Sequence, residues 1–189
     1  MKVTIETSAR HIHISQEDLE ILFGAEHQLT PAKDLSQPGQ FAAEEALTIQ
    51  TEKGVLENVR IIGPLRPRTQ VEISRTDAYK LGINPPNRES GDLDGSAEAT
   101  LIGPKGKVEL TEGVIVALRH IHVTPDDAEK YDLKDQQMVS VKTGRERGLI
   151  FQRVLVRVSP NFAFYMHIDT DEANAAGISG PAEGEIIIE

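Results

Sequence analysis

The sequence predicts a mainly β protein with two small β-barrel domains that arose by internal duplication and are capped by short α-helices. Three observations support this fold class. The chain repeats itself in two places, apolar residues alternate with polar ones in many short segments, and the helical segments last one or two turns. Many short strands with few short helices are typical of small barrels and not of a doubly wound α/β sheet.

The repeat is clearest around two His-x-His motifs. Residues 9–15 (ARHIHIS) align with residues 118–124 (LRHIHVT), and residues 71–74 (VEIS) align with residues 166–169 (MHID). The two similarities occur in the same order along the chain, which favours duplication of a whole half. We therefore expect two related halves around a pseudo-twofold axis.

The domain boundaries follow from this alignment. We predict that the first barrel half covers residues 10–117 and the second covers residues 118–189. The first half is longer, and the Gly/Pro-rich stretch 84–97 is the expected place of the insertion.

Strands are expected where apolar residues alternate with polar or basic ones. These positions are Val3/Ile5, Val59/Ile61, Val71/Ile73, Val139/Val141 and Val154/Val156/Val158.

Short helices are expected after four residues that are good N-caps. These are Ser15, Ser74, Thr124 and Asp169. Pro125 suits the first helical position of the third helix. Gly24, Gly82 and Gly177 are expected to end the other three.

Composition excludes several classes of function. The 189 residues contain 20 Lys and Arg against 30 Asp and Glu, for a net charge of −10, and only 4% aromatic residues. Such a surface repels nucleic acid and offers few rings for base stacking. The chain has no cysteine, which excludes disulfides, a thiol nucleophile and Cys-based metal sites. A bound metal would need His, Asp or Glu ligands.

No apolar run reaches the roughly 20 residues that a membrane-spanning helix needs. The first residues, MKVTIE, form a short alternating strand without the apolar stretch of a signal peptide. We therefore expect a cytoplasmic protein with no membrane partner.

The His-x-His motifs are candidate metal chelates. On a strand, His11 and His13 point to one face while Ile12 points to the other, and His120 and His122 repeat this arrangement. Glu72 and His167 are the aligned residues of the second similarity, and either can supply a third ligand.

A purely structural role is the alternative for these histidines. A single His-x-His pair is more often incidental than metal-binding, whereas two pairs with matched third residues favour a metal. His27 lies outside the pattern and is interpreted as a surface residue.

The last proposed metal ligand on each strand lies close to a predicted helix start, which favours an anion-binding site near the metal ligands. His13, Glu72, His122 and His167 each lie two residues before a predicted N-cap. Free amides at helix starts attract anions, although plain capping explains the same pattern. Arg66 or Arg68, just before Glu72, could bind a phosphate or carboxylate, or could be solvated surface charges.

Five segments together resemble the PduL-type phosphate acyltransferases (phosphotransacylases, or phosphate propanoyltransferases). They are RHIHIS, LSQPGQFAAEE, GPLRPRTQVEISRTDA, GVIVALRHIHV and MHIDTDEANAAGI, and the resemblance runs from about Ser8 to Ile178. The combination is specific, whereas RHIHI alone would be weak. The family transfers a short acyl group, acetyl or propionyl, between coenzyme A and inorganic phosphate.

The resemblance implies a dinuclear zinc site, with two zinc ions per chain, between two β-barrels. It places one ion on His11, His13 and Glu72, and the other on His120, His122 and His167. Arg66 matches the arginine that handles phosphate. The positions that match the coenzyme A pocket are Ser8, Lys33, Arg60 and Asn174. The resemblance also implies that the N-terminal strand, residues 1–9, completes the second barrel.

The implied substrates are acyl-CoA with phosphate, or acyl phosphate with coenzyme A. The chemistry is direct attack of phosphate on the thioester, because no covalent nucleophile can be identified.

The family is associated with propanediol degradation and bacterial microcompartments. Members housed there carry an N-terminal targeting extension, whereas the strand here begins at Lys2, so the enzyme is cytosolic or has lost the extension. A homodimer is the expected assembly.

The sequence is also compatible with three other classes of protein. A bicupin oxygenase or isomerase is one, because His11, His13 and Glu17 have the cupin spacing. A zinc hydrolase and a zinc-stabilised assembly module are the others, although three-ligand sites with an open position favour catalysis.

Overall fold

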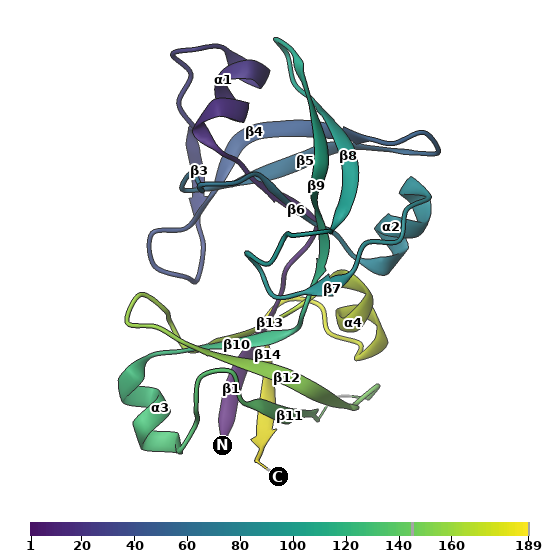
Figure 1. Ribbon diagram of the computed structural model, residues 1–189. Helices are drawn as coiled ribbons and strands as arrows, with labels where there is room; N and C mark the ends of the chain where they lie inside the picture. Colours follow the sequence, from purple (N-terminus) through teal and green to yellow (C-terminus); the bar gives the residue numbers. More distant parts are fainter. Residues whose placement is uncertain (145, 189) are drawn as a thin grey trace. The chain divides into compact units, whose positions relative to one another are not determined.

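Two closed six-stranded β-barrels form the described part of the chain, residues 1–144 and 146–188 of a computed structural model (Figure 1). The predicted mainly β fold with short helices is therefore confirmed. One unit, the first barrel, contains residues 10–35 and 39–117. The other, the second barrel, contains residues 1–9, residues 36–38 and the chain from residue 118 onward.

The first barrel closes because β4 pairs with both β5 and β8. Its strands, in order around the ring, are β4 (Phe41–Gln50), β5 (Val55–Gly63), β2 (His11–His13), β6 (Gln70–Glu72), β9 (Lys107–Ala117) and β8 (Ala97–Ile102). Two further strands pair outside this ring, β3 (Pro31–Asp34) with β4 and β7 (Asn87–Arg88) with β9.

The second barrel repeats this arrangement strand for strand. Its ring order is β1 (Lys2–Thr7), β13 (Tyr165–Ile168), β10 (His120–Val123), β12 (Ile150–Val158), β11 (Met138–Thr143) and β14 (Ala182–Ile187). In both barrels the His-x-His strand pairs antiparallel with one neighbour, β6 or β13, and parallel with the other, β5 or β12. The similarity of the two sequence halves therefore extends to their strand topology.

Each barrel is completed by the strand that precedes the His-x-His motif of the other. β1 leads into β2, yet it pairs with β13 and β14 of the second barrel, where it runs beside the C-terminal strand (Figure 1). β9 leads into β10, yet it pairs with β6 and β8 of the first barrel. The exchange is reciprocal, since each barrel contains the strand that leads into the His-x-His strand of the other.

Within the described residues, four helices begin where the capping residues predict. They are α1 (Gln16–Phe23), α2 (Arg75–Leu81), α3 (Pro125–Tyr131) and α4 (Thr170–Ala175). Ser15, Ser74, Thr124 and Asp169 each accept a hydrogen bond from the backbone amide three residues later. The last helix ends at Ala175, and its C-cap is Ala176 instead of the predicted Gly177, which follows with a left-handed φ of 63°.

Each barrel encloses its own apolar core. Ile12 and Ile14 are buried in the first core, and Ile121 and Val123 are buried in the second, as the alternation predicts. Ile5 of β1 is buried in the second core, although β1 leads into a strand of the first barrel. No helix among the described residues is long and apolar enough to cross a membrane.

The sequence pattern did not indicate the strands β3, β4, β7, β8, β9 and β14. In β4 the register shifts twice against β5, and these irregularities interrupt the simple alternation that predicts a strand. The insertion at 84–97 contains β7 and the buried Leu93, so this segment packs against the barrel.

Candidate metal centres

The strand register of the first barrel brings three potential metal ligands together. His11 lies directly opposite Glu72 in the antiparallel pair of β2 and β6, and His13 lies opposite Gln70. We call His11, His13 and Glu72 the first cluster. All three side chains are buried, and their ligand atoms lie within 4.8 Å of one another.

The spacing within the first cluster suits a zinc ion. The Nε2 atoms of His11 and His13 are 3.1 Å apart. The Glu72 carboxylate lies 3.6 Å from Nε2 of His11 and 3.9 Å from Nε2 of His13. A tetrahedral zinc ion with bonds of about 2.0–2.1 Å holds its ligand atoms about 3.3 Å apart. Small adjustments would therefore bring all three donors onto one ion.

His13 is held in the form that binds a metal. Its Nδ1 lies 3.1 Å from the carbonyl oxygen of Ile62, which favours the proton on Nδ1 and leaves the lone pair of Nε2 toward the cluster. The pKa of His13 is lowered to about 3, mainly by burial and in addition by the nearby His11 and Arg66. The ring is therefore neutral near pH 7.

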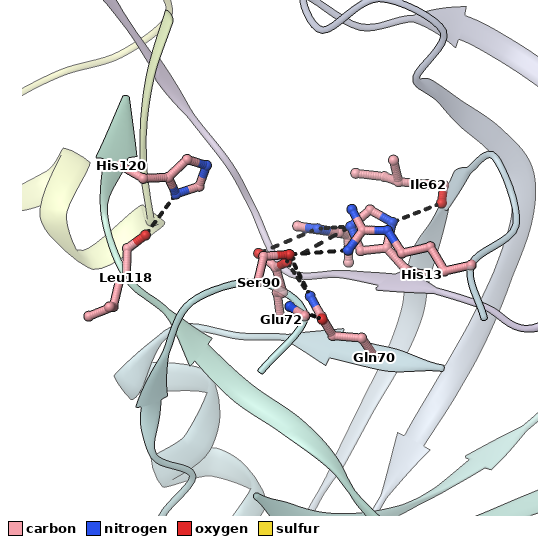
Figure 2. A network of polar contacts seen from close by, with 10 residues as sticks. His13, Ile62, Gln70, Glu72, Ser90, Leu118 and His120 are labelled. Atoms are coloured by element: carbon pink, nitrogen blue, oxygen red, sulfur yellow. Dashed lines mark hydrogen bonds and ion pairs between the residues drawn. The ribbon is translucent and has the colours of Figure 1, made fainter. Parts of the chain in front are cut away.

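A hydrogen-bond network joins Glu72 to Ser90 and Gln70 (Figure 2), and Ser90 connects it to Arg66. Ser90 donates to Oε1 of Glu72 over 2.8 Å and lies 3.1 Å from Nη1 of Arg66, which donates to it. Gln70 donates to the same carboxylate oxygen and accepts from the backbone amide of Gly91. The network fixes the carboxylate and places a guanidinium next to the first cluster.

The sequence did not identify Ser90 or Gln70 as part of this site. Ser90 lies in the 84–97 insertion, which has no counterpart in the second half, so the repeat gives no signal for it. Gln70 lies on the same strand as Glu72, two residues before it. Residues two apart on a strand point to the same face, and this spacing was the available signal for Gln70.

The second barrel brings together His120, His122 and His167, which we call the second cluster. His120 lies opposite His167 in the antiparallel pair of β10 and β13. Their ring centroids are 5.5 Å apart, and that of His122 lies 4.6 Å from His120 and 5.0 Å from His167. Nδ1 of His120 is 2.7 Å from the carbonyl oxygen of Leu118, which leaves Nε2 to face a ligand (Figure 2).

A carboxylate that the sequence did not indicate lies beside the second cluster. Glu6 on β1 has Oε2 3.5 Å from Nε2 of His167. No single-sequence signal pointed to it, because Glu6 precedes the motif and comes next to His167 only through the strand exchange.

The arginine before each His-x-His motif fixes the strand to a helix. Arg10 donates to the Asp77 carboxylate over 2.9 Å, and Arg119 donates to the Glu172 carboxylate over 2.7 Å. Asp77 and Glu172 are the third residues of α2 and α4, the helices that follow the strands of Glu72 and His167. These pairs hold the two ligand-bearing strands of each cluster in place.

The structure distinguishes the two candidate phosphate-binding arginines. The backbone amide of Arg66 donates to the carbonyl of Ile14, the residue after β2, and its half-buried guanidinium contacts Ser90. Arg68 is exposed and forms ion pairs with Asp94 and Glu112. Arg66 is therefore the one that faces the first cluster.

The four predicted coenzyme A contacts occupy both units. In the second barrel, the amide of Ser8 donates to the carbonyl of Ile168, next to His167, and Asn174 is exposed on α4. In the first, Lys33 is exposed on β3, and Arg60 on β5 donates to the carbonyl of Ala43 on β4.

Two other residues lie outside the clusters. Glu17 is exposed in the first turn of α1, so it does not join His11 and His13 as the cupin spacing would require. His27 is half-buried, stacks on Phe23 and pairs with Glu45 over 2.9 Å, so it is more enclosed than the predicted surface residue.

These features define a duplicated two-barrel protein with one candidate metal centre in each barrel. A family model described as phosphate propanoyltransferase matches residues 4–179. The chain belongs to the phosphate propanoyltransferase family and is an acyltransferase.

Several relatives cover most of the chain. A phosphate propanoyltransferase of Thermotoga maritima is 54% identical over 92% of this chain and 83% of its own length. One of Priestia megaterium is 56% identical over 94% of this chain and 82% of its own. One of Listeria monocytogenes is 51% identical over 98% of this chain and 87% of its own.

The lowered pKa of His13 predicts how acid affects the metal-free protein. Between pH 3 and pH 6.5 the unfolded chain binds a proton on His13, whereas the folded chain does not. The contribution of His13 to the free energy of unfolding is therefore fully present above about pH 6.5 and is lost as the pH is lowered. After treatment with a chelator, His13 should contribute on the order of 3 kcal/mol to the loss of unfolding free energy between pH 6.5 and pH 4.

Urea unfolding at a series of pH values measures this loss. A His13→Asn variant should show a shallower dependence on pH than the parent. Equal slopes for the His13→Asn variant and the parent would contradict the assignment.

Proposed function

We propose that this protein transfers a short acyl group, acetyl or propionyl, between coenzyme A and inorganic phosphate, using two zinc ions held by the two clusters. The observation that carries the proposal is the combination, beside β2, of a buried metal-ligand set and a guanidinium. Membership of the phosphate propanoyltransferase family supports the substrate pair.

The donor sets fit zinc. Imidazole and carboxylate are ordinary zinc ligands, and both clusters offer three of them, which leaves a fourth position for substrate. When bound, zinc supplies a Lewis acid that stabilises an oxyanion and accepts a thiolate sulfur. The ligand set with Glu72 carries one negative charge more than the three histidines alone.

Arg66 is proposed to bind and orient phosphate. In a chain of net charge −10, the overall field opposes an anionic substrate, so local cations must attract it. A planar guanidinium can hold two phosphate oxygens at once, and the Ser90 contact fixes its direction. Since His13 is neutral, the guanidinium supplies positive charge there without repulsion from an imidazolium.

The proposed transfer is a direct displacement. A phosphate oxygen forms a bond to the thioester carbonyl carbon, the resulting tetrahedral intermediate collapses, and the carbon–sulfur bond breaks to release coenzyme A as a thiolate. A covalent acyl-enzyme on sulfur is excluded because the chain has no cysteine. Arg66 orients the nucleophile for this attack.

Coenzyme A is proposed to contact Ser8, Lys33, Arg60 and Asn174. Lys33 and Arg60 are exposed cations of the first barrel, which suits the phosphate groups of the cofactor. In the second barrel, the amide of Ser8 donates to the carbonyl of Ile168, next to His167, and Asn174 lies near the C-terminal end of α4.

Thiol release tests the proposed reaction. The purified protein should release free thiol from acetyl-CoA or propionyl-CoA only when inorganic phosphate is present, and acyl phosphate should accumulate in equal amount. Release without phosphate would indicate a hydrolase, and the absence of release with either thioester would contradict acyl transfer.

Elemental analysis tests the metal assignment. The protein should contain about two zinc ions per chain, and His122→Ala should lose one ion and nearly all turnover because two ligands hold zinc poorly. His27→Ala is the matched control and should keep both ions and full activity. Active enzyme without metal would overturn the assignment.

Substitution of Arg66 tests phosphate binding. Arg66→Ala and Arg66→Lys should keep both metals and the fold but lose turnover by roughly 100-fold or more, the range for removal of one anion-stabilising donor. The loss should appear in the dependence on phosphate concentration, while the affinity for coenzyme A measured by calorimetry stays near that of the parent.

Arg68→Ala provides the control, because Arg68 is exposed and paired with two carboxylates. It should retain parental kinetics. Parental activity of Arg66→Ala at low phosphate would show that phosphate is held elsewhere.

A further inference from the structure

Glu6 lies in the same row of side chains as the second cluster. On β1 it is in register with His167 on β13, and His167 is in register with His120 on β10. Residues in register on neighbouring strands point to the same face of a sheet. The Glu6 carboxylate is therefore on the face that carries the histidines, whereas its neighbour Ile5 points into the apolar core.

The corresponding position in the first barrel is apolar. There, Ile115 on β9 is in register with Glu72 and is fully buried. The second barrel has a carboxylate at this position, with 30% of the side chain exposed. A partly buried carboxylate is costly unless it is paired, and its partner here is Nε2 of His167 at 3.5 Å.

A second contact orients the carboxylate. Ser36 donates a hydrogen bond to Oε2 of Glu6, the same oxygen that faces His167. The neighbouring Gln37 is 2% exposed and forms two hydrogen bonds of 3.1 Å with the backbone of Ala163. The loop that carries Ser36 is thus anchored within the second-barrel unit.

We propose that Glu6 is a positioning residue for a metal ion on the second cluster, with Ser36 orienting its carboxylate toward His167. The inference rests on the metal binding proposed above. A carboxylate on one ring nitrogen of a histidine fixes the ring and makes the other nitrogen more basic, so Glu6 on Nε2 of His167 would leave Nδ1 of His167 to bind the ion. Both clusters then include a carboxylate near their histidines, Glu72 in one and Glu6 in the other, which reduces the charge difference between them.

Metal titration of the chelator-treated protein tests this role. Glu6→Gln preserves the shape of the side chain and removes its charge, and it should weaken the binding of one zinc ion by about 10- to 100-fold in competition with a chromogenic chelator. Ser36→Ala should weaken the same ion by a smaller factor. Glu183→Gln is the matched control, since Glu183 is an exposed carboxylate of the same barrel that pairs with Lys2.

Cobalt substitution identifies the site that changes. The visible absorption bands lost in His122→Ala belong to the second cluster, and these bands should shift in Glu6→Gln while the others remain. Loss of barrel stability alone would not shift one set of bands. Parental affinities for both ions with unchanged bands in Glu6→Gln would overturn the inference, as would a parent protein that binds no ion at His122.

The outcome is separate from that of the proposed reaction. If the parent binds two ions and Glu6→Gln loses affinity for one, the role of Glu6 stands even when thiol release fails. If thiol release depends on phosphate but Glu6→Gln binds both ions as the parent does, the transferase stands and the role of Glu6 does not.

Discussion

Antiparallel pairing of each His-x-His strand with the strand of its third ligand is the constraint on which both clusters depend. The register of β2 against β6 puts His11 opposite Glu72, and the register of β10 against β13 puts His120 opposite His167. A shift by one residue would turn these side chains into the core and Ile12 or Ile121 out of it. Burial of those isoleucines thus stabilises the register that gathers the ligands. Arg10 and Arg119 support it by joining each His-x-His strand to the helix after its partner strand.

The reciprocal strand exchange gives each barrel the strand that precedes the His-x-His motif of the other barrel. In the second barrel this strand is β1, which brings Glu6 beside His167. In the first barrel it is β9, which puts the fully buried Ile115 in the corresponding place. The two halves share their topology, but the donated strands differ in chemistry. The insertion adds a second asymmetry, since it supplies the Ser90 hydroxyl that donates to the Glu72 carboxylate and has no counterpart in the second half of the sequence.

The electrostatics of the first cluster differ from those of the chain as a whole. The protein is acidic, yet burial keeps His13 neutral and the half-buried Arg66 supplies a fixed positive charge beside it. A neutral imidazole can bind a metal ion. The hydrogen bond to Ser90 fixes the orientation of the Arg66 guanidinium. The same enclosure therefore favours metal binding and anion binding.

The sequence by itself determined the fold class, the helix starts and the identity of the two clusters, because each depends on local pattern or on repetition. Caps act over three residues, and alternation shows which face of a strand is buried. Only the tertiary structure decided that Ser90, Gln70 and Glu6 contact these clusters and that Arg66, not Arg68, faces the first one. Such contacts form between segments distant in the chain, and strand register, loop path and strand exchange are set by packing of the whole barrel. No local signal in a single sequence records the contacts of Ser90, Glu6 and Arg66, whereas Gln70 shares a strand face with Glu72.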